Sequence, residues 1–266
     1  MASTGSSSSF RTRFGTALLV GLPGIVALVA YVYRSTPSGA VPAGLSRPSL
    51  ALLSGLNPLL LLVVACLVGA YAAPRAGLRS HLLDRAGGAG VRERLRPEVG
   101  FAVGVGVGGS LLVLALDVAL APFVARDLPQ SAIGAARPTV VDVLAHAPVR
   151  FLYGGVTEEL LLRFGLMSAL TLAGWVLVGR RGDAPGPRVI WAAIAISAVL
   201  FGVGHLPALA GAVGLTPALV ARTVLLNAVA GVAFGWLYWR RSLEAAMVAH
   251  AAFHVPLVAL SLIQVL

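Results

Sequence analysis

Long runs of apolar residues dominate the chain, and short polar segments rich in arginine separate them. A run of about 18 or more apolar residues is long enough for a helix to cross the ~30 Å hydrocarbon core of a bilayer. Seven runs meet this length, at residues 15–33, 49–73, 100–124, 151–178, 189–206, 217–239 and 243–264. The pattern predicts an all-α fold, a polytopic transmembrane helical bundle with about seven spans in a lipid bilayer.

Two apolar segments, residues 139–148 and the first span, need a separate interpretation. The stretch 139–148 is too short to cross, so we expect a short interfacial helix that leads into the fourth span. The first span follows a basic, serine-rich start, a pattern that a signal peptide shares. Because the run is long enough to span and no clear cleavage site precedes Arg34, we interpret it as a transmembrane helix after a tail of residues 1–14.

The charged residues fix an orientation for the bundle. They make up 11% of the 266 residues, far below the ~25% of soluble domains. All 20 basic residues are arginine, which together with the abundant Ala and Gly indicates a GC-rich bacterial genome. Loops on one side carry 13 arginines and loops on the other carry five, so the net charge of +10 reflects topology rather than a nucleic-acid surface. We expect a multi-pass protein of the bacterial inner membrane with a cytoplasmic N-terminus.

Ionisable side chains inside the fourth span are the first indication of chemistry. Glu158, Glu159 and Arg163 lie in an otherwise apolar segment, although a charge at the centre of a bilayer costs at least ~2.5–3.5 kcal/mol. Adjacent residues on an α-helix diverge by about 100°, so the two carboxylates cannot share a face. Glu159 and Arg163 have the i, i+4 spacing of an ion pair, which leaves Glu158 as the free base in a water-filled pocket. The alternative is an ion-pair network that only holds helices together.

Histidines in the fifth and seventh spans complete the candidate site. His205 follows Phe201 by one helical turn and lies among glycines that permit close approach; Phe201 either walls the pocket or only packs. His250 and His254 share one helix face, a spacing that can hold a metal. Zinc or another divalent metal would need ligands from several helices, and the candidate set is Glu158, His205 and His250. The sequence leaves the presence of a metal open.

These three elements, in this order, resemble the CPBP family of intramembrane endopeptidases, which includes type II CAAX prenyl proteases and lysostaphin-resistance-like proteins. The family pattern is EExxxR, then FxxxH, then HxxxN or HxxxD. The chain matches the first at Glu158, Glu159 and Arg163, the second at Phe201 and His205, and the third at His250. It departs at His254, where the family usually has Asn or Asp. The resemblance covers residues 139–266, the expected catalytic region, and leaves residues 15–138 as generic N-terminal spans.

The resemblance implies hydrolysis of a peptide bond in a membrane-associated protein or peptide. Glu158 and His205 are expected to activate water, because a carboxylate in a low-dielectric pocket is a stronger base than one in water. His250 and His254 are then expected to face the oxyanion, with Glu159, Arg163 and Phe201 as support. Members are described both as metalloproteases and as glutamate-dependent proteases. Two alternatives stay open: a catalytically impaired immunity or scaffold protein of the same fold, and a proton-coupled transporter.

Depth within the bilayer is harder to reconcile for one residue. Glu158 is eight residues past Arg150 and His250 is ten past Arg240, which puts each ~12–15 Å from a membrane boundary. His205 is 17 residues past Arg188, or ~25 Å, so the fifth helix must tilt, begin later or break at its glycines. Elsewhere in the spans, we expect an ion pair between Asp117 and Arg222, and we expect Asn227 to form a hydrogen bond between helices.

Overall fold

The computed structural model describes residues 9–84, 90–127 and 138–266, and regular secondary structure in this part is helical throughout. The long helices are α1 (Phe10–Ser35), α2 (Arg47–Arg75), α3 (Val91–Val124), α7 (Pro187–Gly204), α9 (Pro217–Arg240) and α10 (Leu243–Val265). Two short helices are η1 (Ser38–Ala40) and α8 (Leu206–Ala212). Between residues 140 and 177 the chain forms one continuous helix from α5 (Val140–Pro148), η2 (Val149–Glu158), η3 (Leu160–Met167) and α6 (Ser168–Leu177).

Seven helical segments in this part of the chain are long and apolar enough to cross a membrane, which confirms the predicted polytopic all-α bundle. The boundaries of the spanning helices differ from the predicted ones where a helix continues into a polar segment. The third span begins at Val91 rather than at residue 100, because the charged segment before it is helical. The predicted interfacial helix is α5, which continues into the fourth span without an intervening loop.

The helix from residue 149 to residue 167 is wider than an α-helix. Both η2 and η3 are π-helical, and at their end the Ser168 N–H donates to the carbonyl of Arg163, five residues earlier. A π-helix has more residues in each turn than an α-helix, so neighbouring side chains diverge less than an α-helical pattern implies. Such segments are rare and occur frequently at functional sites. The pair Glu158 and Glu159 lies at the junction of η2 and η3.

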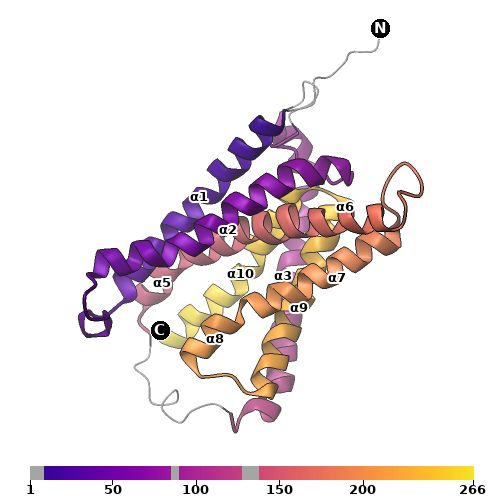
Figure 1. Ribbon diagram of the computed structural model, residues 1–266. Helices are drawn as coiled ribbons and strands as arrows, with labels where there is room; N and C mark the ends of the chain where they lie inside the picture. Colours follow the sequence, from indigo (N-terminus) through magenta and orange to yellow (C-terminus); the bar gives the residue numbers. More distant parts are fainter. Residues whose placement is uncertain (1–8, 85–89, 128–137) are drawn as a thin grey trace.

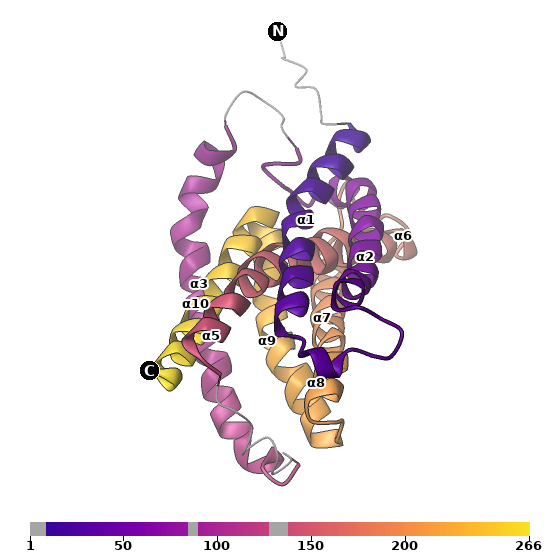
Figure 2. The same ribbon diagram turned by 90° about the vertical axis from the view of Figure 1, so that its left-hand side faces the viewer.

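The continuous helix of residues 140–177, called the central helix from here on, lies at the centre of the bundle. η2 packs against α1 and α10, while η3 packs against α2 and α7. Figure 1 shows α2 along one side of the central helix and α7, α9 and α10 on the other. Figure 2 shows α3 standing beside α10 at the edge of the bundle. The Glu158–Glu159 junction is therefore within reach of helices from both the N-terminal and the C-terminal part of the chain.

Small residues allow α2 to approach the central helix closely. A Cβ atom at Gly69 would lie 2.6 Å from the carbonyl oxygen of Phe164. One at Gly165 would lie 2.6 Å from Cβ of Ala65 and 2.8 Å from its Cα. Both positions exclude any side chain without a shift of backbone, which is the role that small residues have in membrane helix packing. This contact sets the distance between α2 and η3, the two walls of the cavity described below.

Polar contacts outside the site fix the rest of the bundle. The predicted pair of Asp117 and Arg222 is confirmed as a salt bridge between α3 and α9. The expectation for Asn227 is wrong: its side-chain amide donates to the carbonyl of Thr223 in the same helix at 2.9 Å. One anchor was not foreseen, the buried Glu244, which accepts hydrogen bonds from Ser80 Oγ (2.6 Å) and the His81 backbone N–H (2.9 Å). This carboxylate ties the loop after α2 to the start of α10.

Candidate active site

The fifth span breaks at His205. α7 ends at Gly204 and α8 begins at Leu206, so His205 sits at the junction of two helices. Its Nδ1–H donates to the carbonyl of Phe201 at 2.8 Å, and since a carbonyl can only accept, the remaining nitrogen Nε2 carries no proton in neutral His205. Gly202 and Gly204 lie within the unbroken α7, so the break comes at His205 itself and does not shorten the helical distance from Arg188.

Glu159 is the centre of a buried polar chain. Its side chain is 0% exposed, and its Oε1 lies 3.2 Å from Arg163 Nη1, as the i, i+4 spacing predicted. The same oxygen lies 2.8 Å from Nδ1 of His250, a contact that the spacing along one helix could not predict. Arg163 Nη2 donates in turn to the carbonyl of Gly231 on α9 at 2.9 Å. The chain thus joins three helices, while Glu159 Oε2 and Arg163 Nε have no hydrogen-bond partner among the described residues.

His250 is held in one tautomer by this chain. Because Glu159 beside Arg163 is an acceptor, Nδ1 of neutral His250 carries the proton and Nε2 carries the lone pair. Nε2 lies 3.9 Å from Oε2 of Glu158. That separation is too long for a direct hydrogen bond, and a polar contact of this length is one in which a single water can touch both atoms.

Aromatic rings enclose the polar chain. The guanidinium of Arg163 lies 5.0 Å from the ring centre of Phe201 and 5.4 Å from that of Phe234, within cation–π distance. His250 stacks on Phe234 with ring centres 4.5 Å apart, and Phe201 meets His250 edge-on at 5.8 Å. Phe201 also contacts His205 edge-on at 4.8 Å. Phe201 therefore contacts both imidazoles.

A cavity of about 1070 Å³ opens beside these residues, between α2, the central helix and the α7–α8 junction. Most of its wall is apolar, and the residues on it with ionisable side chains are Glu158, His205 and Tyr153. The Glu158 side chain is 18% exposed, while those of Glu159 and His250 are 0% and 3% exposed. Of the two adjacent carboxylates, Glu158 is the one that faces the cavity, and Glu159 lies behind it.

The sequence-derived site residues fall into two groups. Glu158, His205 and Phe201 line the cavity, and His250 contacts Glu158 from behind the wall. His254 stacks on His250 at 5.1 Å but is not part of the wall. Neither ring nitrogen of His254 has a hydrogen-bond partner among the described residues. Its Nε2 instead packs against the backbone of Gly154, where a Cβ atom would lie 2.7 Å away.

The expected metal ligands do not converge. Within residues 9–84, 90–127 and 138–266, no group of three or more His, Cys, Asp or Glu side chains is arranged to hold a metal ion. Each imidazole has its Nδ1–H bonded, to Glu159 in His250 and to the Phe201 carbonyl in His205, which leaves Nε2 free as in a metal-bound histidine. The misfit therefore lies in the spacing of the three side chains and not in their donor atoms. In the part of the chain that the structure describes, Glu158, His205 and His250 do not form the expected metal site.

Two features of the site were missed in the sequence. Tyr153 lies five residues before Glu158 and lines the same cavity, a relationship that an α-helical reading of the span does not bring out. The contact between Glu159 and His250 joins residues 91 positions apart and depends on how α10 packs on η2. For Tyr153, the available signal in the sequence was a tyrosine in an apolar span five residues before a pair of carboxylates.

Comparison with protein families agrees with this geometry. Residues 140–255 match the family described as type II CAAX prenyl endopeptidase Rce1-like. Over these residues the chain is similar to the Rce1-like family. The matched segment spans the central helix with its carboxylate pair, the His205 junction and His254 on α10, and it confirms the resemblance drawn from the three motifs. Comparisons with the curated proteins and with the solved structures gave no match. This match supports intramembrane endopeptidase activity in general terms.

Proposed function

We propose that the protein is an intramembrane endopeptidase that hydrolyses a peptide bond of a membrane-associated protein or peptide. The observation that carries the proposal is the placement of Glu158 on the wall of the apolar cavity, with Nε2 of His250 3.9 Å from its Oε2. A water that touches both atoms meets two acceptors, one of which is held by Glu159 in the form that can take a proton. The match to the Rce1-like family supports the same class of activity.

In the proposed mechanism, Glu158 removes a proton from the water as the water attacks the scissile carbonyl. His250 accepts this proton from Glu158 at Nε2, while its Nδ1–H remains bound to Glu159. The proton then returns through Glu158 to the leaving amine nitrogen as the C–N bond of the tetrahedral intermediate breaks. Arg163 pairs with Glu159, and the carboxylate of Glu159 stabilises the imidazolium that forms. His205 accepts at Nε2 and orients the water or the substrate amide within the cavity. This arrangement assigns His250 to proton transfer, whereas the sequence alone had placed it at the oxyanion.

The hydroxyl of Tyr153 is the donor on the cavity wall that best suits the oxyanion. It lies on the same wall as Glu158, and no hydrogen bond of this hydroxyl occurs within the described residues. A preorganised donor in an apolar site stabilises developing negative charge far better than one in water. We therefore assign the oxyanion contact to Tyr153 and give His254 a packing role against Gly154 and His250.

The cavity also bears on the substrate and on the membrane setting. Its wall is mostly apolar and includes side chains of α2 and α7, so an apolar segment of a membrane-associated substrate fits it. We further propose that the protein lies in the bacterial inner membrane with the arginine-rich loops and the N-terminus in the cytoplasm. In this arrangement residues 139–266 form the catalytic region and residues 15–138 supply the wall at α2.

The test is cleavage of a membrane-anchored peptide library by purified protein in liposomes, with products identified by mass spectrometry. Wild type is expected to cleave at defined bonds, and Glu158→Gln to lose about 100-fold or more of that rate. Asp183→Asn, an exposed carboxylate in the loop after α6, is the matched control and is expected to retain full rate. Cleavage unaffected by Glu158→Gln contradicts the proposal. Proton-coupled solute flux that Glu158→Gln stops would instead establish a transporter, and binding without cleavage a scaffold.

A further inference from the structure

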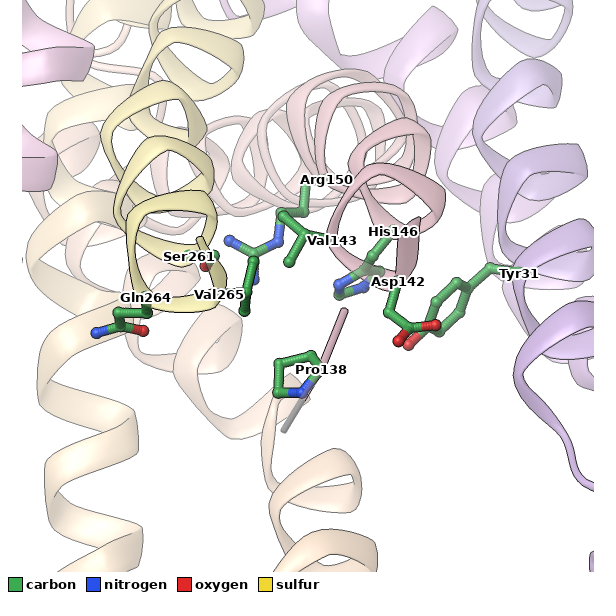
Figure 3. Close-up of a pocket in the computed structure, with 9 residues that line it drawn as sticks. All are labelled: Tyr31, Pro138, Asp142, Val143, His146, Arg150, Ser261, Gln264 and Val265. Carbon is green, nitrogen blue, oxygen red and sulfur yellow. The ribbon is translucent and has the colours of Figure 1, made fainter. Parts of the chain in front are cut away.

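A second cavity lies where the end of α1, the start of the central helix and the end of α10 meet (Figure 3). Its volume of about 550 Å³ falls within the ~300–1,000 Å³ range of small-ligand sites. It shares no lining residue with the active-site cavity, and its polar wall consists of Tyr31, Asp142, His146, Arg150, Ser261 and Gln264. The sequence interpretation and the proposed mechanism assign no role to these side chains.

Arg150 is the charged centre of this cavity and lacks a counter-ion. Its side chain is half-buried, and within the described residues it makes no hydrogen bond, ion pair or ring contact. Residues 1–8, 85–89 and 128–137 contain no Asp or Glu, so no side-chain carboxylate lies outside the described part of the chain. A guanidinium partly withdrawn from water is costly to leave alone, and an anion that accepts its paired N–H groups relieves that cost.

The one carboxylate on the wall is already engaged. Asp142 Oδ2 accepts from the backbone N–H of Thr139 at 2.9 Å and from its hydroxyl at 2.7 Å, which caps α5. Figure 3 shows Asp142 beside Tyr31, whereas the Arg150 guanidinium extends toward α10 near Ser261. The cavity therefore keeps a positive end at Arg150 that Asp142 does not neutralise.

Further donors surround the cavity. His146 stacks on Tyr31 with ring centres 4.5 Å apart, and within the described residues neither side chain forms a hydrogen bond. Gln264 offers an amide NH₂ from α10. The Ser261 hydroxyl donates to the carbonyl of Leu257 at 2.8 Å, so its oxygen is available only as an acceptor. One arginine with several neutral donors is a set suited to a ligand with several oxygen acceptors, such as a phosphate.

The position of the cavity indicates where such a phosphate comes from. α1 ends at Ser35 and α10 ends at Val265, so the cavity lies at the ends of membrane spans, where lipid headgroups lie. We propose that this cavity binds the phosphate of a phospholipid headgroup, with Arg150 as its principal ligand. The binding is independent of the proposed peptidase activity, and it anchors α1, the central helix and α10 to one another at the membrane surface.

The experiment measures binding to the purified full-length protein by native mass spectrometry with three probes. These are phosphatidylglycerol, a diacylglycerol with the same acyl chains, and inorganic phosphate. Phosphatidylglycerol is expected to bind wild type, and Arg150→Gln to weaken that binding about 10-fold or more through loss of charged hydrogen bonds. Arg47→Gln is the matched control, because Arg47 lies at the same end of the bundle but outside the cavity, with a hydrogen bond to Ser38. It is expected to bind as wild type does.

Each outcome decides the proposal. Equal weakening by Arg150→Gln and Arg47→Gln, or equal binding of diacylglycerol and phosphatidylglycerol, overturns it. Inorganic phosphate that competes at the concentration of the lipid would support the phosphate site and assign it to a soluble source. Arg150→Lys keeps the charge but loses the paired donors, so binding is expected to fall between wild type and Arg150→Gln. If either Arg150 variant fails to fold, Gln264→Leu at an exposed position supplies the same comparison with a smaller expected loss.

Discussion

Glu159 accepts a hydrogen bond from Nδ1 of His250 at 2.8 Å, across 91 residues of sequence and between the central helix and α10. Through this bond the carboxylate that pairs with Arg163 also selects the tautomer of the imidazole that faces Glu158. The two acidic residues of this motif thus have different roles. Glu158 lines the cavity, and Glu159 orients His250 through a hydrogen bond.

A double-mutant cycle on Glu159 and His250 tests this coupling. Glu159→Gln and His250→Gln are each expected to lower kcat by about 100-fold or more, since the first removes the carboxylate that orients His250 and the second removes the proton acceptor itself. Because the residues act as a unit, the double variant is expected to be little slower than either single variant. Turnover kinetics of the four proteins provide the measurement. Multiplicative losses in the double variant would show that the two side chains act separately.

His250 and His254 are expected to respond differently to the same substitution. His250→Asn removes the bond to Glu159 and the nitrogen opposite Glu158, so activity is expected to fall about 100-fold or more. His254→Asn exchanges a side chain that lies outside the cavity wall, and it is expected to keep activity within about 3-fold. Cleavage rates of the two variants, compared at equal folded fraction, make the check. Similar large losses for both would place His254 in the reaction.

Tyr153→Phe tests the oxyanion assignment. The substitution keeps the ring and deletes only the hydroxyl on the cavity wall, so kcat is expected to fall about 100-fold with KM little changed. Steady-state kinetics with one cleaved peptide distinguish the two parameters. A rise in KM with constant kcat would assign Tyr153 to substrate binding instead.

Arg163 is expected to be irreplaceable by lysine. Its guanidinium bonds Glu159 and the carbonyl of Gly231 and lies between Phe201 and Phe234, which a lysine ammonium cannot reproduce. Arg163→Met leaves Glu159 as a buried charge without its partner and is expected to destabilise the protein by ~3–5 kcal/mol. Thermal unfolding in detergent measures both variants. Wild-type stability in Arg163→Met would contradict the role of the pair.

The close approach of α2 to the central helix gives a test of packing. Gly69→Ala places a Cβ atom 2.6 Å from a backbone oxygen of Phe164, so it is expected to lower both stability and activity. Gly104→Ala in α3 is the matched control, because nothing lies within 4 Å of its added Cβ atom. There the better helix propensity of alanine is expected to leave stability equal or raised, by up to ~1 kcal/mol. Equal effects of the two substitutions on the unfolding temperature would refute the contact.

Much of the fold follows from the apolar pattern, since membrane spans need long apolar runs. The pair of Glu159 and Arg163 was predictable from its i, i+4 spacing, and the pair of Asp117 and Arg222 from the cost of leaving either charge alone in a span. The π-helical widening was not, because apolar composition does not distinguish i→i+4 from i→i+5 hydrogen bonding. Asn227 shows the same limit, since its amide found a partner within its own helix.

The candidate site was predictable as a set of residues but not as an arrangement. Three short motifs on separate spans identified Glu158, His205 and His250. Which carboxylate faces the cavity, which nitrogen of His250 is free, and whether His254 reaches the wall depend on the rotation of α10 against η2. Spacing within one helix holds no information about that rotation.

The central claim is that Glu158 activates a water molecule rather than attacking the substrate itself. The most direct measurement is a single turnover of a cleaved peptide in H₂¹⁸O, with the product carboxylate analysed by mass spectrometry. Activation of water puts ¹⁸O into the new carboxylate in the first turnover. A first-turnover product that carries ¹⁶O from the enzyme, with ¹⁸O appearing only in later turnovers, would mean that Glu158 forms a covalent intermediate and would contradict the mechanism.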